Sequence, residues 1–159
     1  MLEAGLRACE VSTLRCKDLR KIEHEFDGRY EIYKLRVKGK WRRRYDEYIF
    51  LSKRFYDLLS SFSSTRREFV FEGRGGKPIT TRKLRNIVKK VLTAAGLGEH
   101  SAHHLRHTYA KLMYDATGNL AALKRQLRHK SISLTAYYAG ILRETTGEHD
   151  WTDATLFQD

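Results

Sequence analysis

The stretch SAHHLRHTYA, residues 101–110, is predicted to begin a helix that carries two cationic side chains on one face. His103 and Arg106 stand three residues apart, a spacing that places both side chains on the same side of a helix. Such donors can neutralise the nonbridging oxygens of a phosphodiester while negative charge builds on them during phosphoryl transfer. Taken alone, the stretch is equally compatible with a solvated basic helix end.

Two other interpretations of local motifs are disfavoured. His103 and His107 have the spacing of paired zinc ligands on a helix, but no glutamate follows His103 and no third ligand is apparent. The string EGRGGKPI invites comparison with a phosphate-binding loop, but Pro78 follows Lys77 where magnesium binding needs Ser or Thr. We therefore expect neither a metal nor a cofactor.

The hydrophobic pattern around this stretch predicts an α+β fold, mainly helical with a small three-stranded antiparallel sheet. Between residues 20 and 51, turn signals at Asp27-Gly28 and at the Gly39-Lys40-Trp41 turn separate three strand-like segments, which predicts a meander. A short strand is expected at 68–71, and helices at 1–11 with an interruption at Gly5, 53–62, 80–92, 105–116, 119–127 and 133–142.

The segment TTRKLRNIVKKVL, residues 80–92, is predicted to be a helix with a basic outer face. Its apolar residues recur at helical spacing and are expected to pack inward: Leu84, Ile87, Val88 and Val91. The remaining positions include five cations: Arg82, Lys83, Arg85, Lys89 and Lys90. This helix can bind a polyanion or be a solvated charged face.

The charge of the chain also indicates a polyanionic partner. The 159 residues carry a formal charge of +12. Because residues 143–159 have a local charge of −4 (five acidic residues and one arginine), residues 1–142 carry +16. Such an excess is typical of nucleic-acid or anionic-membrane binding, and the alternative is a merely soluble basic protein.

Cysteine usage and hydropathy predict a cytoplasmic protein. Cys9 and Cys16 lack C-x-x-C spacing, which fits a reducing compartment, and both are expected to be small buried side chains. No apolar run approaches the roughly 20 residues of a membrane span, and the N-terminal residues lack the pattern of a signal peptide.

Four further residues extend the pair in SAHHLRHTYA to a set of six. His129 follows Arg106 by 23 residues and Tyr138 follows His129 by nine, while Arg7 and Lys40 lie upstream. With these residues the chain resembles the tyrosine recombinases, the phage-integrase family of site-specific DNA recombinases. The resemblance runs to about residue 142, through the motifs GLRACEVSTLRCKDL, VKGKWRRRYDEYIFL, SAHHLRHTYA and LRHKSISLTAYY.

The resemblance implies a catalytic role for each of the six. Arg7 and Arg106 would clamp the scissile phosphate through bidentate hydrogen bonds, and His103 would bind a nonbridging oxygen or assist proton transfer. Lys40 would be the general acid that protonates the departing 5′-oxygen. Lys38 is its rival, because a slip along the strand would exchange the two.

The same resemblance implies that Tyr138 is the nucleophile, and that His129 bonds the phosphate and helps to orient Tyr138. Tyr137 points about 100° away around the helix and is expected to pack the helix onto the body. Glu10 fits the family's Gly-Leu-Arg-x-x-Glu pattern as structural support. Arg128 stands where the family usually has glycine, so this turn either holds a left-handed residue at about 1 kcal/mol of strain or differs in shape. A shifted turn would exchange the two tyrosines.

The implied reaction is a transesterification through a 3′-phosphotyrosyl bond that needs neither a metal nor ATP, with surrounding cations favouring the phenolate. The implied partner is double-stranded DNA, on which protomers form a tetramer, whereas the isolated chain is expected to be a monomer. The basic helix 81–92 and the arginines Arg42, Arg43 and Arg44 would bind the DNA backbone without reading its sequence.

The expected organisation is a catalytic domain at residues 1–142 and an acidic tail at 143–159. The N-terminal core-binding domain of the family is expected to be absent, so the chain alone should bind DNA weakly. The tail is expected either to dock on a neighbouring protomer or to be a frayed terminus. The source is expected to be bacterial, archaeal, or a phage or mobile element. The alternatives are a type IB topoisomerase and a non-catalytic DNA-binding relic.

Overall fold

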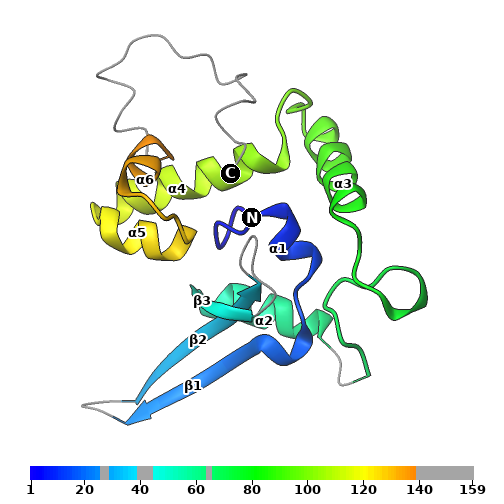
Figure 1. The fold of residues 1–159 in the computed structure, drawn as a ribbon, viewed down its shortest axis with the longest axis horizontal. Helices are drawn as coiled ribbons and strands as arrows, with labels where there is room; N and C mark the ends of the chain where they lie inside the picture. The colour runs from blue at the N-terminus through cyan, green and yellow to red at the C-terminus, as the bar shows by residue number, and fades with distance from the viewer. Residues whose placement is uncertain (26–28, 39–44, 64–65, 139–159) are drawn as a thin grey trace.

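Three antiparallel strands form the sheet of the computed structural model (Figure 1). They are β1 (Leu19–Glu25), β2 (Arg29–Lys38) and β3 (Tyr45–Leu51). Leu35 of β2 lies opposite Leu19 of β1 and Ile49 of β3. The predicted meander is confirmed. The structure describes residues 1–25, 29–38, 45–63 and 66–138, so both turns of the meander lie outside the described residues.

The sheet packs on a first hydrophobic cluster. The alternating residues Tyr33, Leu35 and Val37 of β2 are buried, as the period of a strand predicts. Helices α1 (Ala8–Ser12) and α2 (Lys53–Phe62) lie beside the sheet. Side chains from these helices and the adjoining loops complete the cluster: Leu6, Leu14, Leu59 and Val70.

Three helices form a second cluster: α4 (Ala102–Thr117), α5 (Leu120–Leu127) and α6 (Ile132–Tyr138). Its buried core consists of Ala110, Leu123, Leu127 and Tyr138. The helices begin where side-chain caps are available, since Ser101 accepts a hydrogen bond from the His103 N–H and Asn119 accepts one from the Ala122 N–H. The predicted helices are thereby confirmed up to residue 138, and 139–142 lie outside the described residues.

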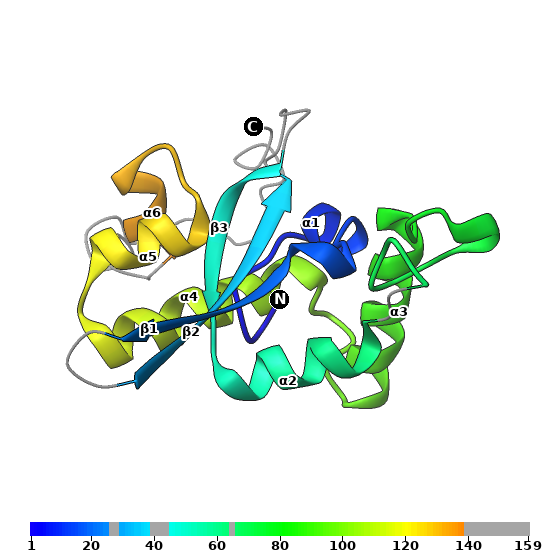
Figure 2. The same ribbon diagram turned by 90° about the horizontal axis from the view of Figure 1, so that it is seen from below.

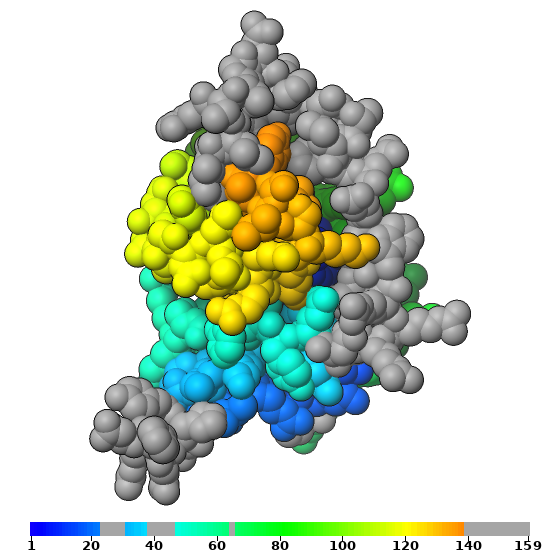
Figure 3. Space-filling model, turned by 60° about the vertical axis from the view of Figure 1, so that its left-hand side comes forward, coloured from blue at the N-terminus to red at the C-terminus, as the bar shows by residue number. Residues whose placement is uncertain are grey.

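A pair of hydrogen bonds joins the two clusters between α5 and β3, which lie against each other in the space-filling view (Figure 3). The Phe50 N–H donates to Gln126 Oε1 at 3.1 Å, and Gln126 Nε2 donates to the Phe50 carbonyl at 2.9 Å. The buried amide of Gln126 thus satisfies the backbone of the β3 edge.

Helix α3 (Thr81–Ala94) lies at the other end of α4 from α5 and α6 (Figures 1 and 2). Leu84 and Leu92 are buried, whereas Ile87 and Val91 are exposed, so the expectation that these two pack inward is wrong. The inward stripe follows Leu84, the half-buried Val88 and Leu92 at four-residue steps. The five predicted cations of this helix are all exposed.

Three smaller expectations also need correction. The first residues form a turn and not a helix until Ala8, because Gly5 has a left-handed φ of 60° and the Tyr109 ring packs where a Cβ would stand. Residues 68–71 contribute only an isolated bridge, Arg15 with Phe69, and no strand. Cys9 is exposed and Cys16 only half-buried.

Within the described ranges, no helix has the length and apolar character needed to span a membrane.

Candidate active site

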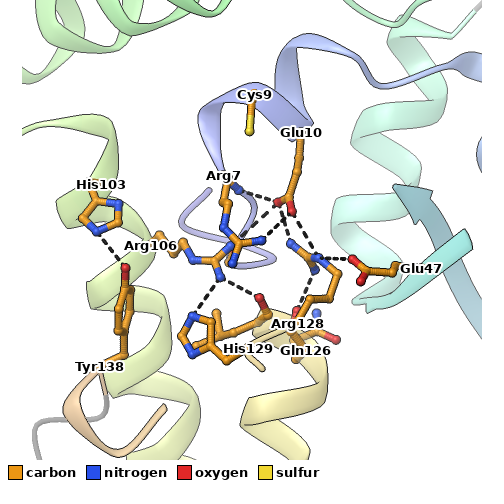
Figure 4. A network of polar contacts seen from close by, with 12 residues as sticks. Arg7, Cys9, Glu10, Glu47, His103, Arg106, Gln126, Arg128, His129 and Tyr138 are labelled. Carbon is orange, nitrogen blue, oxygen red and sulfur yellow. Dashed lines mark hydrogen bonds and ion pairs between the residues drawn. The ribbon is translucent and has the colours of Figure 1, made fainter. Parts of the chain in front are cut away.

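Five of the six predicted catalytic residues meet where α1, α4 and the turn between α5 and α6 approach one another (Figure 4). Arg7 caps the start of α1, and His103 and Arg106 occupy the first turns of α4. His129 follows the end of α5, and Tyr138 ends α6 as described. The sixth, Lys40, lies outside the described residues, as do Arg42, Arg43 and Arg44, and the side chain of Lys38 is not described.

Arg106 is the central cation of this site and is only 1% exposed. Its Nη1 donates to the Gly5 carbonyl at 2.7 Å, and its Nη2 donates to the Leu127 carbonyl at 2.6 Å. Burial, helped by the nearby Arg7, lowers the pKa of Arg106 to about 9, so the guanidinium remains charged at neutral pH. Its buried Nε has no hydrogen-bond partner within the described part of the chain. An acceptor that enters the site can therefore satisfy it.

Glu10 holds the arginines together from α1, where its carboxylate is fully buried. It accepts hydrogen bonds from the Arg7 N–H at 2.6 Å and from Arg7 Nη1 at 3.1 Å, and it pairs with Arg128 on its other side. Burial alone would raise the pKa of Glu10, but Arg128, Arg106 and Arg7 together lower it. The carboxylate is therefore ionised at neutral pH and is fully paired.

The residue before His129 adopts the left-handed conformation, although it is an arginine and not a glycine. Arg128 has φ 57° and ψ 43°, and it is the only non-glycine residue with positive φ in the described ranges. Of the two possibilities for this turn, the strained left-handed one is observed. The ion pair between Arg128 and Glu10 offsets the strain, which sequence spacing could not indicate because the partners are 118 residues apart.

The hydrogen bonds of His129 fix its tautomer. A guanidinium can only donate, so His129 Nε2 accepts from Arg106 Nη2 at 3.1 Å and the ring proton lies on Nδ1. Nδ1 in turn donates to Thr135 Oγ1 at 3.2 Å, and Thr135 donates to the Ser131 carbonyl. Burial and the adjacent Arg106 lower the pKa of His129 to about 3. His129 is therefore neutral at physiological pH.

Tyr138 presents its hydroxyl to this cluster. The Tyr138 hydroxyl lies 2.8 Å from His103 Nε2, and burial followed by Arg106 lowers the pKa of His103 to about 4. A neutral His103 can accept the phenolic proton. The Tyr138 ring stacks on His107, with centroids 3.9 Å apart and planes 8° apart. Tyr137 is half-buried and packs against the second cluster, as expected.

The electrostatics around Tyr138 differ from the sequence-based expectation that cations favour its phenolate. Arg106 and Arg7 do lower the pKa of Tyr138, but burial outweighs them and raises it above the ordinary value. The resting residue is therefore a protonated phenol. His107, considered in the sequence only as a disfavoured zinc ligand, stacks on one face of the Tyr138 ring. Its four-residue spacing from His103 is the sequence signal for that position, since the two histidine rings also contact each other.

The lowered histidine pKa values predict acid sensitivity of the folded state. An unfolded histidine has a pKa of about 6.5, whereas burial lowers the pKa of His103 to about 4 and that of His129 to about 3 in the folded chain. Below pH 6.5 the unfolded chain binds more protons, so this contribution to stability is complete above that pH and declines as the pH falls. We expect the thermal unfolding midpoint to fall between pH 6.5 and 5, and to fall less steeply in His129→Gln. Parallel pH profiles of the two proteins would contradict this.

Comparisons with known proteins bear on the family and the fold of the chain. The Phage integrase family model matches residues 1–144. The chain is 28% identical over 146 residues to the probable integrase/recombinase YoeC of Bacillus subtilis, covering 91% of this chain and 76% of YoeC. It is 28% identical over 139 residues to tyrosine recombinase XerH of Campylobacter jejuni, covering 84% of this chain but 37% of XerH.

The fold also matches solved recombinases. A crystal structure of XerH bound to its difH substrate, in a pre-cleavage complex, superposes with a TM-score of 0.67 at 24% identity, over 91% of this chain and 41% of that one. At 24% identity the structural similarity supports only the fold. The family assignment rests on the family model, which matches residues 1–144. The chain belongs to the phage integrase family, and its fold is that of tyrosine recombinase catalytic domains.

Proposed function

We propose that this chain is the catalytic part of a site-specific DNA recombinase that cuts and rejoins strands through a phosphotyrosyl bond on Tyr138. The observation that supports it most is the Tyr138 hydroxyl, 2.8 Å from His103 Nε2 and beside the buried Arg106, whose Nε lacks a partner among the described residues. These groups supply a nucleophile, a proton acceptor and an anion site. The chain spans less than half the length of XerH, so the activity of a whole recombinase is part of this proposal.

In the proposed reaction the Tyr138 oxygen attacks the scissile phosphorus while its proton passes to His103 Nε2. The bond from phosphorus to the 5′-oxygen breaks, and the 3′-phosphate remains on tyrosine. Arg7 and Arg106 hold the nonbridging oxygens and stabilise the charge that builds on them. The leaving oxygen needs a proton, for which Lys40 remains the candidate. A 5′-hydroxyl of a partner strand reverses the step, so one phosphodiester is exchanged for another without ATP.

His129 has a more indirect part in this proposal than the sequence indicated. Its Nε2 already accepts a hydrogen bond from Arg106, so in the free chain it cannot donate from that atom to a phosphate. It aligns the guanidinium from one side, and Thr135 fixes the ring from the other. The burial of both side chains keeps this alignment in place before DNA arrives.

DNA is the proposed partner because the exposed cations of α3 form a basic face. Contacts from such side chains to phosphates give binding that weakens steeply with salt. We also propose that protomers assemble as a tetramer on DNA, and that the catalytic domain spans residues 1–142. The tail at 143–159, proposed to dock on a neighbouring protomer, lies outside the described residues, and a tail deletion that leaves association on DNA unchanged would exclude that role.

The test is a covalent trapping experiment. The chain is incubated in EDTA and without ATP with nicked duplexes whose cut strand cannot be rejoined, and the products are separated by denaturing electrophoresis. The duplexes carry a randomised centre, so that many candidate target sequences are tested together. We expect a protein–DNA adduct that protease removes. No adduct at any salt concentration would leave a non-catalytic DNA-binding protein, and rapid relaxation of a supercoiled plasmid of arbitrary sequence would favour a type IB topoisomerase.

A further inference from the structure

We propose that Arg128 is a positioning residue for the proposed cleavage reaction. By pairing with Glu10, it keeps the guanidinium of Arg106 directed toward the phosphate. This inference rests on the proposed function and adds to it a residue at which the chain departs from the glycine usual at this position. Arg128 does not itself touch the reacting atoms, since its side chain is only 4% exposed and is held by other groups.

The guanidinium of Arg128 makes a bidentate hydrogen-bonded ion pair with the Glu10 carboxylate. Nε donates to Oε1 at 3.2 Å and Nη2 donates to Oε2 at 2.5 Å, while Nη1 donates to the Gln126 carbonyl at 2.7 Å (Figure 4). Glu47 of β3 adds a looser ion pair at 3.6 Å. Arginine can make this bidentate contact and lysine cannot. Arg128 therefore links the turn that carries His129 to both α1 and β3.

The pairing decides which cations Glu10 neutralises. Arg106 Nη1 stands 3.7 Å from Glu10 Oε2, beyond hydrogen-bond distance, because Arg128 and Arg7 already fill the carboxylate. Without the Arg128 side chain, two acceptor positions open beside Arg106, and a buried carboxylate takes the nearest donor. Arg106 would then turn toward Glu10 and away from an incoming phosphate.

Removal of the Arg128 side chain would also lower the formal charge of the group of ionised side chains around Glu10. Three arginines (Arg7, Arg106 and Arg128) against two carboxylates (Glu10 and Glu47) leave +1, and removal of one arginine leaves zero. A neutral cluster stabilises the added charge of the phosphorane less, whereas the exposed cations of α3 that bind the DNA backbone are unchanged. Arg128 thus contributes charge to the site without making contact with the substrate.

Arg128→Gly isolates the side chain from the backbone, because glycine adopts φ 57° more easily than arginine does. We expect the single-turnover rate of adduct formation to fall at least tenfold, while the affinity for the nicked duplex stays within about twofold. Arg128→Lys should recover part of the rate, since it restores the charge but not the fork. Glu47→Gln is the matched control: it removes the looser partner of Arg128, leaves the pair with Glu10 intact and raises the formal charge of the cluster to +2, so it should not slow adduct formation.

A double-mutant cycle separates positioning from general damage. If Arg128 acts through Glu10, the double variant Arg128→Gly with Glu10→Gln should react no more slowly than the slower single variant. A wild-type rate of adduct formation in Arg128→Gly would overturn the inference. Fully additive losses of rate in the double variant would overturn it too, as would a loss of rate in Arg128→Gly that weaker DNA binding accounts for entirely. If Arg128→Gly fails to fold, a wild-type rate in folded Arg128→Lys overturns it as well. Absence of an adduct with the unmodified chain overturns the proposed function and this inference together, whereas a normal adduct in Arg128→Gly overturns the inference alone.

Discussion

Tyr138→Phe is expected to abolish the covalent adduct, with a loss in rate of about a thousandfold or more. The substitution removes only the oxygen that attacks phosphorus. The ring keeps its stacking on His107 and its edge contact with His129, so the site retains its shape. The lost hydrogen bond to His103 should lower the free energy of unfolding by about 1 kcal/mol. Adduct yield after denaturing electrophoresis and thermal melting of the same preparation measure both effects.

Tyr137→Phe is the matched control because it makes the same change one residue away. The Tyr137 side chain packs against the second cluster, and its ring makes edge contacts with the Tyr138 ring at 6.3 Å and the His107 ring at 6.5 Å. We expect its adduct rate to stay within about threefold of the unmodified chain. An adduct that persists in Tyr138→Phe and disappears in Tyr137→Phe would reassign the nucleophile.

Local sequence patterns were sufficient to predict most of the fold. The alternation of Tyr33, Leu35 and Val37 matches the buried face of β2. The helix expected at 53–62 is α2, and it begins after Ser52, whose hydroxyl accepts a hydrogen bond from the Phe55 N–H. The exposed Ile87 and Val91 show the limit of such patterns. Helical periodicity identifies an apolar stripe, but which edge of a wide stripe faces inward depends on the neighbouring helices.

The site shows a different limit. The spacing of His103, Arg106, His129 and Tyr138 could be read from the chain, and the structure brings their side chains together. The same spacing says nothing of burial, and burial sets the protonation states. Burial raises the pKa of Tyr138 although Arg106 and Arg7 lower it, and burial lowers the pKa of His103 so that this histidine is neutral. The partner of Arg128 could not be predicted from the sequence either, because Glu10 lies 118 residues away along the chain.

Arg106→Lys is expected to damage both stability and chemistry although it preserves charge. The guanidinium donates from two nitrogens to three acceptors, the carbonyls of Gly5 and Leu127 and the His129 ring. An ammonium group is a single point and cannot span these acceptors, so at least one is left unpaired in a site that is 1% exposed. We expect the free energy of unfolding to fall by about 2–4 kcal/mol and the adduct rate to fall by about a hundredfold or more.

Chemical denaturation and single-turnover trapping measure these two losses separately. The control is Arg125→Lys on α5, where the arginine is exposed and the same change should shift the unfolding free energy by no more than about 0.5 kcal/mol. A variant that melts like the unmodified chain would show that the carbonyls of Gly5 and Leu127 find other donors. A variant that is destabilised yet reacts at the normal rate, measured well below its melting temperature, would show that Arg106 serves the fold alone. The proposed anion site requires both losses, because the hydrogen bonds that hold the guanidinium in place are the ones that keep it aligned for the phosphate.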